Sequence, residues 1–151
     1  MRIGSTPLVL ALGLLLTPVT AGAAENFTFE STLKLVDSLR VPATGSPFQG
    51  ARVFSLSNTA TFADGRKATT TGKCASWTAG PGSGFTSTGV CASPDTYNLR
   101  FDCSPAADKP DESDCWGRLE FLGGPAKGRT GVVAFRRNAD STRFVGVGTQ
   151  N

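Results

Sequence analysis

Four polar residues interrupt runs of alternating apolar side chains, and their types could do chemistry inside a protein: Asp37, Asn58, Tyr97 and Glu120. A carboxylate such as Asp37 or Glu120, held in an apolar cavity, would have a raised pKa suited to acid–base work. Asn58 could orient a ligand carbonyl or hydroxyl, and Tyr97 could offer its hydroxyl as the polar tip of a buried ring. We therefore predict these four as ligand-binding residues and assign no catalytic residue.

Each of the four also has a plainer interpretation. The strand that carries Asp37 could simply be leaving the core there, and Asn58 could satisfy a neighbouring backbone group. Tyr97 could be an ordinary core residue, and Glu120 could form a surface ion pair with Arg118 or Arg100.

The chain contains no histidine, which removes Ser-His-Asp and Cys-His catalysis and His-ligated zinc. An acidic cluster at Asp108, Asp111, Glu112 and Asp114 offers oxygen ligands, but its spacing matches no EF-hand. A solvated loop is the favoured interpretation, and we expect neither a metal nor a cofactor.

The first 24 residues have the layout of a secretory signal peptide. Arg2 supplies the positive start, Leu8 to Leu16 form the apolar core, and small residues precede a cleavage site after Ala23 or Ala24. That core makes about 14 Å of helix, too short for a bilayer interior of roughly 30 Å. We expect an exported protein, periplasmic or extracellular, with residues 25–151 as a single domain and no membrane span after cleavage.

Period-two alternation of apolar residues predicts β-strands along the rest of the chain. From Phe27 onward every second residue faces one side through Leu33, Leu35, Asp37 and Leu39. Asp64-Gly65 marks a tight hairpin turn. We predict eight strands, at 27–40, 54–62, 67–77, 85–92, 97–103, 115–122, 129–137 and 143–149. This is an all-β chain, and a closed antiparallel barrel is favoured over a sandwich.

The four cysteines indicate two disulfides, because an even number in a small exported domain is typical of disulfide pairing. Three pairings are possible. The strand order favours Cys103–Cys115, which closes the acidic loop, and Cys74–Cys91, which ties the third strand to the fourth.

Two Thr-Gly-x-Cys units, at 71–74 and 88–91, and a later pattern of Trp116, Gly123-Gly124, Lys127-Gly128 and Gly131 resemble exported bacterial proteins with an allene-oxide-cyclase-type barrel. These proteins are similar in fold to plant allene oxide cyclases and dirigent proteins. The resemblance implies an eight-stranded barrel with a largely apolar cavity, which some members use to cyclise or couple hydrophobic small molecules. No catalytic residue of that family falls on a matching motif here.

Removal of Arg2 with the leader changes the formal net charge from +3 to +2, which is too small and too scattered for nucleic-acid binding. The late arginines do not form one patch, because Arg136 and Arg137 point to opposite faces of their strand.

Three functions remain open: an exported barrel that binds a small hydrophobic molecule, a cofactor-free cyclase or isomerase, and a structural or interaction protein with a filled barrel. A cavity lined by Phe27, Phe29, Phe54 and Phe62 with one buried acid would favour the enzyme. A cavity without an ionisable group would favour binding, and a filled barrel would exclude both. The sequence assigns no oligomeric state.

Overall fold

Alternating side chains build eight strands, as predicted. The computed structural model describes residues 24–41, 49–79 and 82–151, so the predicted leader lies outside the described residues except for Ala24. The strands are β1 (Glu25–Val41), β2 (Gln49–Phe62), β3 (Lys67–Thr78), β4 (Ser87–Ser93), β5 (Tyr97–Pro105), β6 (Ser113–Phe121), β7 (Thr130–Arg137) and β8 (Arg143–Gln150). One 3-10 turn, η1 (Gly124–Ala126), lies between β6 and β7.

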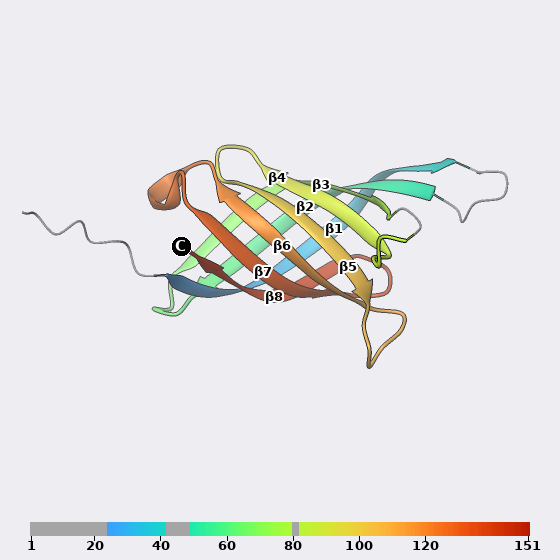
Figure 1. Cartoon of the computed structure of the whole chain (residues 1–151). Coiled ribbons are helices and arrows are strands. Elements are labelled where there is room, and N and C mark those ends of the chain that lie inside the picture. The colour runs from blue at the N-terminus through green and yellow to red at the C-terminus, as the bar shows by residue number, and fades with distance from the viewer. Residues whose placement is uncertain (1–23, 42–48, 80–81) are drawn as a thin grey trace, which may run out of the picture.

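Each strand pairs antiparallel with the next, and β1 pairs with β8, so the sheet is a closed barrel (Figure 1). Closure leaves no strand edge unpaired along the barrel wall, so the barrel offers no open edge to a strand of another chain. The predicted barrel is confirmed. Within the part of the chain that the structure describes, no helix has the length and hydropathy needed to cross a bilayer.

The inner face of the barrel carries the core. Alternate residues of every strand point inward, and the buried apolar cluster includes Leu33, Phe54, Leu99, Phe101, Leu119, Phe135 and Phe144. Aromatic rings share this space with glycines of neighbouring strands. A Cβ on Gly89 would lie 2.4 Å from Cζ of Phe101, so that ring occupies the volume above the glycine.

The alternation of β1 changes partway along the strand. A register shift lies between Leu35 and Asp37, and toward their loop β1 and β2 extend beyond their other neighbours as a ribbon that projects from the barrel (Figure 1). Leu35 and Leu39 are exposed, although the period-two pattern placed them with Phe27 on a buried face. The inward face of β1 ends at Leu33 because the pairing of β1 with β8 ends at Thr32.

Two disulfides cross-link neighbouring strands, with the predicted pairing. Cys74 on β3 is bonded to Cys91 on β4, and Cys103 on β5 is bonded to Cys115 on β6. All four cysteines are buried inside the barrel. Oxidised cysteines are consistent with an oxidising, exported environment.

The barrel has two different ends. At the open end lie the β2–β3 hairpin, the β4–β5 and β6–β7 connections, η1 and the C-terminus (Figure 1). At the ribbon end lie the projecting part of β1 and β2 and the β5–β6 and β7–β8 connections. The candidate site lies at the open end.

Candidate functional site

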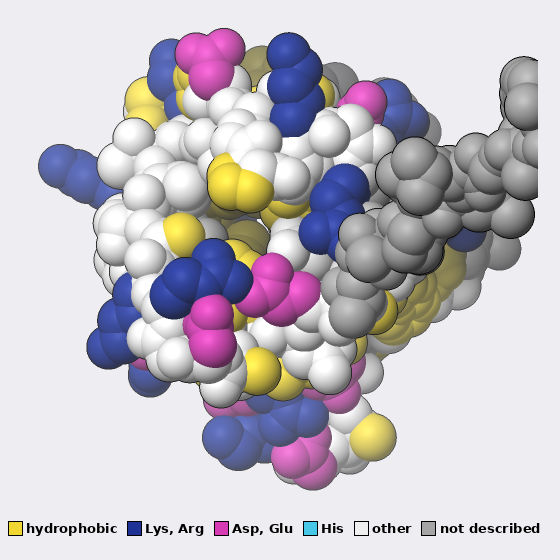
Figure 2. Space-filling view, turned by 90° about the vertical axis from the view of Figure 1, so that its left-hand side faces the viewer, with side chains coloured by type: hydrophobic (Ala, Val, Ile, Leu, Met, Phe, Trp, Pro, Cys, Tyr) yellow, Lys and Arg dark blue, Asp and Glu magenta, His cyan; other side chains and the backbone are white. Residues whose placement is uncertain are grey.

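A cavity of about 400 Å³ occupies the open end of the barrel. Figure 2 looks onto this end, where the surface is hollowed, hydrophobic side chains line the hollow, and charged side chains lie around it. Inward-facing residues from several strands form its walls, including Phe27, Phe29, Leu56, Phe62, Leu119 and Phe121. Such a cavity excludes charged ligands from its interior and favours apolar ones.

The floor of the cavity is the filled half of the barrel. Cys91, Phe144 and Val133 lie at the base. Beneath them the Phe135 ring contacts Phe101 and Phe144, with ring centroids 5.5 and 5.0 Å apart. The hollow is therefore confined to the open end, because large rings fill the interior on the other side.

A first polar position on the wall is Asn58. The buried Ser31 hydroxyl donates a hydrogen bond to Asn58 Oδ1 at 2.8 Å, which orients the amide group. The amide nitrogen, Asn58 Nδ2, has no hydrogen-bond partner among the described residues, and the Asn58 side chain lines the cavity. This atom is available to a ligand oxygen or hydroxyl.

The second polar position on the wall is formed by Tyr97 and Thr70, which both line the cavity. The Tyr97 side chain is buried, and this burial raises the pKa of its phenol above the ordinary value of 10.0, an effect that the nearby Thr70 hydroxyl partly offsets. The Thr70 hydroxyl is itself buried and lacks a partner with hydrogen-bond geometry. An unsatisfied buried hydroxyl is costly, and a polar group on a ligand would relieve that cost.

Three charged residues at the mouth, Glu25, Asp64 and Arg66, are paired with one another. Arg66 ion-pairs with Glu25 at the start of β1 and with Asp64 in the hairpin turn, where Nε and Oδ2 are 2.5 Å apart. Hydrogen bonds from the Arg66 side chain and backbone hold the pKa of Asp64 below its usual value. The guanidinium carbon of Arg66 lies 4.8 Å from the centroid of Phe62, so the arginine covers part of the rim. Gln150 donates to the second Glu25 oxygen at 2.6 Å.

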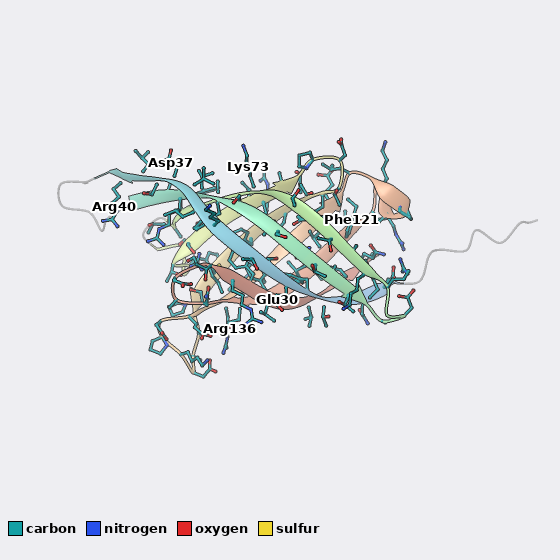
Figure 3. The ribbon with its side chains drawn as sticks, turned by 180° about the vertical axis from the view of Figure 1, so that it is seen from behind. Glu30, Asp37, Arg40, Lys73, Phe121 and Arg136 are labelled. Carbon is teal, nitrogen blue, oxygen red and sulfur yellow. A yellow bond between two sulfur atoms is a disulfide. The ribbon has the colours of Figure 1, made fainter. Side chains whose placement is uncertain are left out.

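The structure brings together two of the four residues that the sequence singled out. Asn58 and Tyr97 both line the cavity. Asp37 lies on the ribbon, at the opposite end of the molecule from Phe121 (Figure 3), and its carboxylate accepts a hydrogen bond from the Ser38 amide. Glu120 is exposed on the outer face of β6. Neither carboxylate reaches the cavity, because the register shift displaces Asp37 and Leu119 and Phe121 take the inward positions beside Glu120.

Strand alternation could also have identified Thr70. It lies on β3 four residues before Cys74, on the same face as that buried cysteine. Glu25 and Arg66 carry no comparable signal, because they meet at the mouth only after the first strand and the hairpin turn are brought together.

The cavity has no carboxylate in its depth. Its acidic lining residues are Glu25 and Asp95, from the start of β1 and the β4–β5 connection at the mouth. Phe27, Phe29 and Phe62 line it as expected, whereas Phe54 is packed into the filled half. Arg66 and Arg129 also line the cavity at its mouth, whereas the Tyr97 phenol lies in the inner wall, where its raised pKa keeps it protonated at neutral pH. It can donate a hydrogen bond there, and it cannot act as a base.

Carboxylates of the acidic segment between β5 and β6 form ion pairs with Arg136 of β7. Arg136 Nε lies 2.9 Å from Asp114 Oδ1, and its Nη2 lies 2.9 Å from Asp108 Oδ1. The hydrogen bonds that Arg136 donates to these two carboxylates raise its pKa, and the same guanidinium lowers the pKa of Asp108. These two carboxylates balance a cation of the protein itself.

Comparison with known proteins adds no relative: no family model, curated protein or solved structure matches the chain.

Proposed function

We propose that the protein is an exported barrel that binds a small hydrophobic molecule in the open end. The observation that carries the proposal is the cavity of about 400 Å³, because its walls are mostly apolar and its few polar atoms converge on one region. Ligand pockets in proteins commonly have this size and this combination of surfaces.

The polar atoms of the wall narrow the chemistry of the ligand. Asn58 offers one amide atom, and Thr70 and Tyr97 offer hydroxyls. None of the three carries a charge at neutral pH. A neutral molecule with an apolar body and one carbonyl or hydroxyl would bury its body against the phenylalanines and satisfy these groups.

Export of the protein is part of the proposal. The N-terminal pattern of a positive start, a short apolar core and small residues supports a cleaved leader. The two disulfides support the same compartment, because they persist where the environment is oxidising.

A cofactor-free cyclase or isomerase of hydrophobic molecules is the second candidate. The protonated Tyr97 phenol favours it, because a hydrogen-bond donor within an apolar cavity could polarise a ligand oxygen while the walls fix the ligand's conformation. The resemblance to allene-oxide-cyclase-type barrels points the same way. Binding ranks first because the depth of the cavity holds no carboxylate.

Filling the cavity tests the proposal directly. Ala60 lines the cavity on β2, and Ala60→Phe would place a ring in the hollow. The matched control is Ala134→Phe on β7, whose side chain is exposed on the outer face. We expect N-phenyl-1-naphthylamine, a neutral apolar dye, to bind the unmodified protein and the control equally. Its affinity for Ala60→Phe should fall about tenfold or more, since the added ring occupies its volume.

Native mass spectrometry of protein isolated from the exported fraction of its host identifies the natural ligand. We expect a reproducible non-covalent adduct of a few hundred daltons that is absent from Ala60→Phe. Equal dye binding by all three proteins would overturn the proposal. Turnover of the identified ligand by the purified protein would instead establish the cyclase or isomerase.

A further inference from the structure

A second polar site lies inside the barrel at the ribbon end. Arg137 is the last residue of β7 and follows Val133 and Phe135 on the inward face. Its side chain is half-buried, and Nη2 donates hydrogen bonds to Ser87 Oγ at 3.0 Å and to Ser113 Oγ at 3.3 Å. These two hydroxyls come from β4 and β6, so the arginine reaches across the barrel interior.

A second arginine faces the same space. Arg52 lies two residues before Phe54 on β2, on the inward side of the strand, and pairs in register with the buried Ser76. Burial lowers the pKa of Arg137, and the nearby positive charge of Arg52 lowers it further. Arg40 is opposite Gly50 on the ribbon (Figure 3), which brings a third positive charge to this side.

Neither Arg52 nor Arg137 has a carboxylate partner among the described residues. The nearby acids of the β5–β6 connection bind Arg136, which points to the outer face. Partial burial of the Arg137 guanidinium without a counter-ion, next to the positive charge of Arg52, is unfavourable. The open end differs, because there Arg66 is paired with Glu25 and Asp64.

We propose that the ribbon end binds a doubly charged tetrahedral oxyanion, such as sulfate or phosphate, between Arg52 and Arg137. A charge of −2 neutralises the two guanidinium groups, whose planar N–H donors suit oxyanions. The Ser87 and Ser113 hydroxyls accept hydrogen bonds from Arg137, so each retains its own proton to donate to the anion.

This anion site is separate from the apolar cavity. The aromatic cluster of Phe101, Phe135 and Phe144 and the Cys103–Cys115 disulfide lie between them. Occupation of one site should therefore leave the affinity of the other unchanged, and the anion site does not depend on the proposed hydrophobic ligand.

Titration of the full mature protein with sulfate, inorganic phosphate and methyl phosphate tests the site. Ionic strength is held constant with sodium chloride, and the Nε–H resonances of the arginines are followed by NMR. We expect saturable shifts at Arg52 and Arg137 with the divalent anions, and about tenfold weaker binding of acetate. Tighter binding of methyl phosphate than of phosphate would identify a phosphate monoester as the ligand, and the reverse would identify the free ion.

Three variants locate the binding. Arg137→Gln should abolish the saturable shifts, and Arg52→Gln should weaken sulfate binding about tenfold. The matched control, Arg118→Gln, removes the same charge from the exposed outer face of β6 and should leave binding unchanged. Arg52 is exposed and makes no hydrogen bond across the barrel, so Arg52→Gln remains informative if Arg137→Gln does not fold. Absence of saturation, or equal binding by Arg52→Gln and the control, would overturn the proposal.

Discussion

The interior of the barrel is filled by side chains at one end and hollow at the other. At the ribbon end, Phe54, Phe101 and Phe135 fill the space between strands, and a disulfide joins β5 to β6. At the open end, phenylalanines line the walls but leave a hollow of about 400 Å³. An eight-stranded barrel is just wide enough for side chains to fill it. The difference shows that the choice of side chain at each inward position, and not the strand number, decides whether such a barrel is filled.

Charge divides the two ends as well. The arginine at the mouth of the cavity is paired with carboxylates, whereas the arginine inside the ribbon end contacts only serine hydroxyls. A rim whose Arg66 is paired with carboxylates leaves the apolar cavity to an apolar ligand, and an interior cation without a carboxylate partner suits an anion. The following predictions test how independent the ends are, from the largest expected effect to the smallest.

Removing an aromatic ring should cost far more at the filled end. Phe135 is buried and contacts Phe29, Phe101 and Phe144, so we expect Phe135→Ala to lower the free energy of unfolding by about 3–5 kcal/mol. Phe62 borders the cavity and is only partly buried, so Phe62→Ala should cost about 1–2 kcal/mol. Urea denaturation measures both. Equal losses would contradict the division into a filled and a hollow half.

Removing the Cys103–Cys115 disulfide should lower the stability of the protein without changing its affinity for the dye. The double variant Cys103→Ala, Cys115→Ala opens a cross-link between residues 12 positions apart and should lower the free energy of unfolding by about 2–4 kcal/mol. Dye affinity should not change, because neither cysteine lines the cavity. The matched variant Cys74→Ala, Cys91→Ala should lower both, because Cys91 forms part of the cavity floor. A loss of dye binding in the first variant would show that the two ends are coupled.

The smallest expected effect is the titration of Tyr97 in the cavity wall. Tyr97 is the single tyrosine of the chain, so ultraviolet absorbance at alkaline pH reports the cavity alone. Burial raises its pKa above 10.0, and Thr70→Val should raise it further by removing the neighbouring hydroxyl. A raised folded-state pKa means that this contribution to stability is complete below the unfolded value and is lost as pH rises toward the folded value. A measured pKa at or below 10.0 would contradict a closed apolar wall.

Much of the architecture could be predicted from local patterns. Alternation of apolar residues predicted all eight strands, and Asp64-Gly65 predicted the turn between β2 and β3, where Gly65 has a φ of 85°. The disulfide pairing followed from assigning the cysteines to consecutive strands. The strands, the turn and the disulfide pairing each depend on residues that are close in sequence or on strands that follow one another. Local sequence patterns are therefore enough to predict them.

The alternation of apolar residues was not enough to predict which polar residues lie in the cavity wall. Asp37 follows Leu33 and Leu35 in an unbroken period of two, and the register shift that moves it outward comes from pairing with β2. Glu120 is flanked by Leu119 and Phe121, and only closure of the barrel shows that these two neighbours point inward. Asn58 and Tyr97 lie on the cavity wall because their strand positions face the hollow half.

By itself, the sequence determined the strands of one small all-β domain, and it favoured a closed barrel and the cysteine pairing that the structure has, because period-two patterning and turn residues act locally. Only the tertiary structure decided which faces point inward, which half of the interior is hollow, and that Arg52 and Arg137, from strands far apart in the chain, face one space. These properties depend on how the side chains of all eight strands share a single interior, and no one strand specifies that.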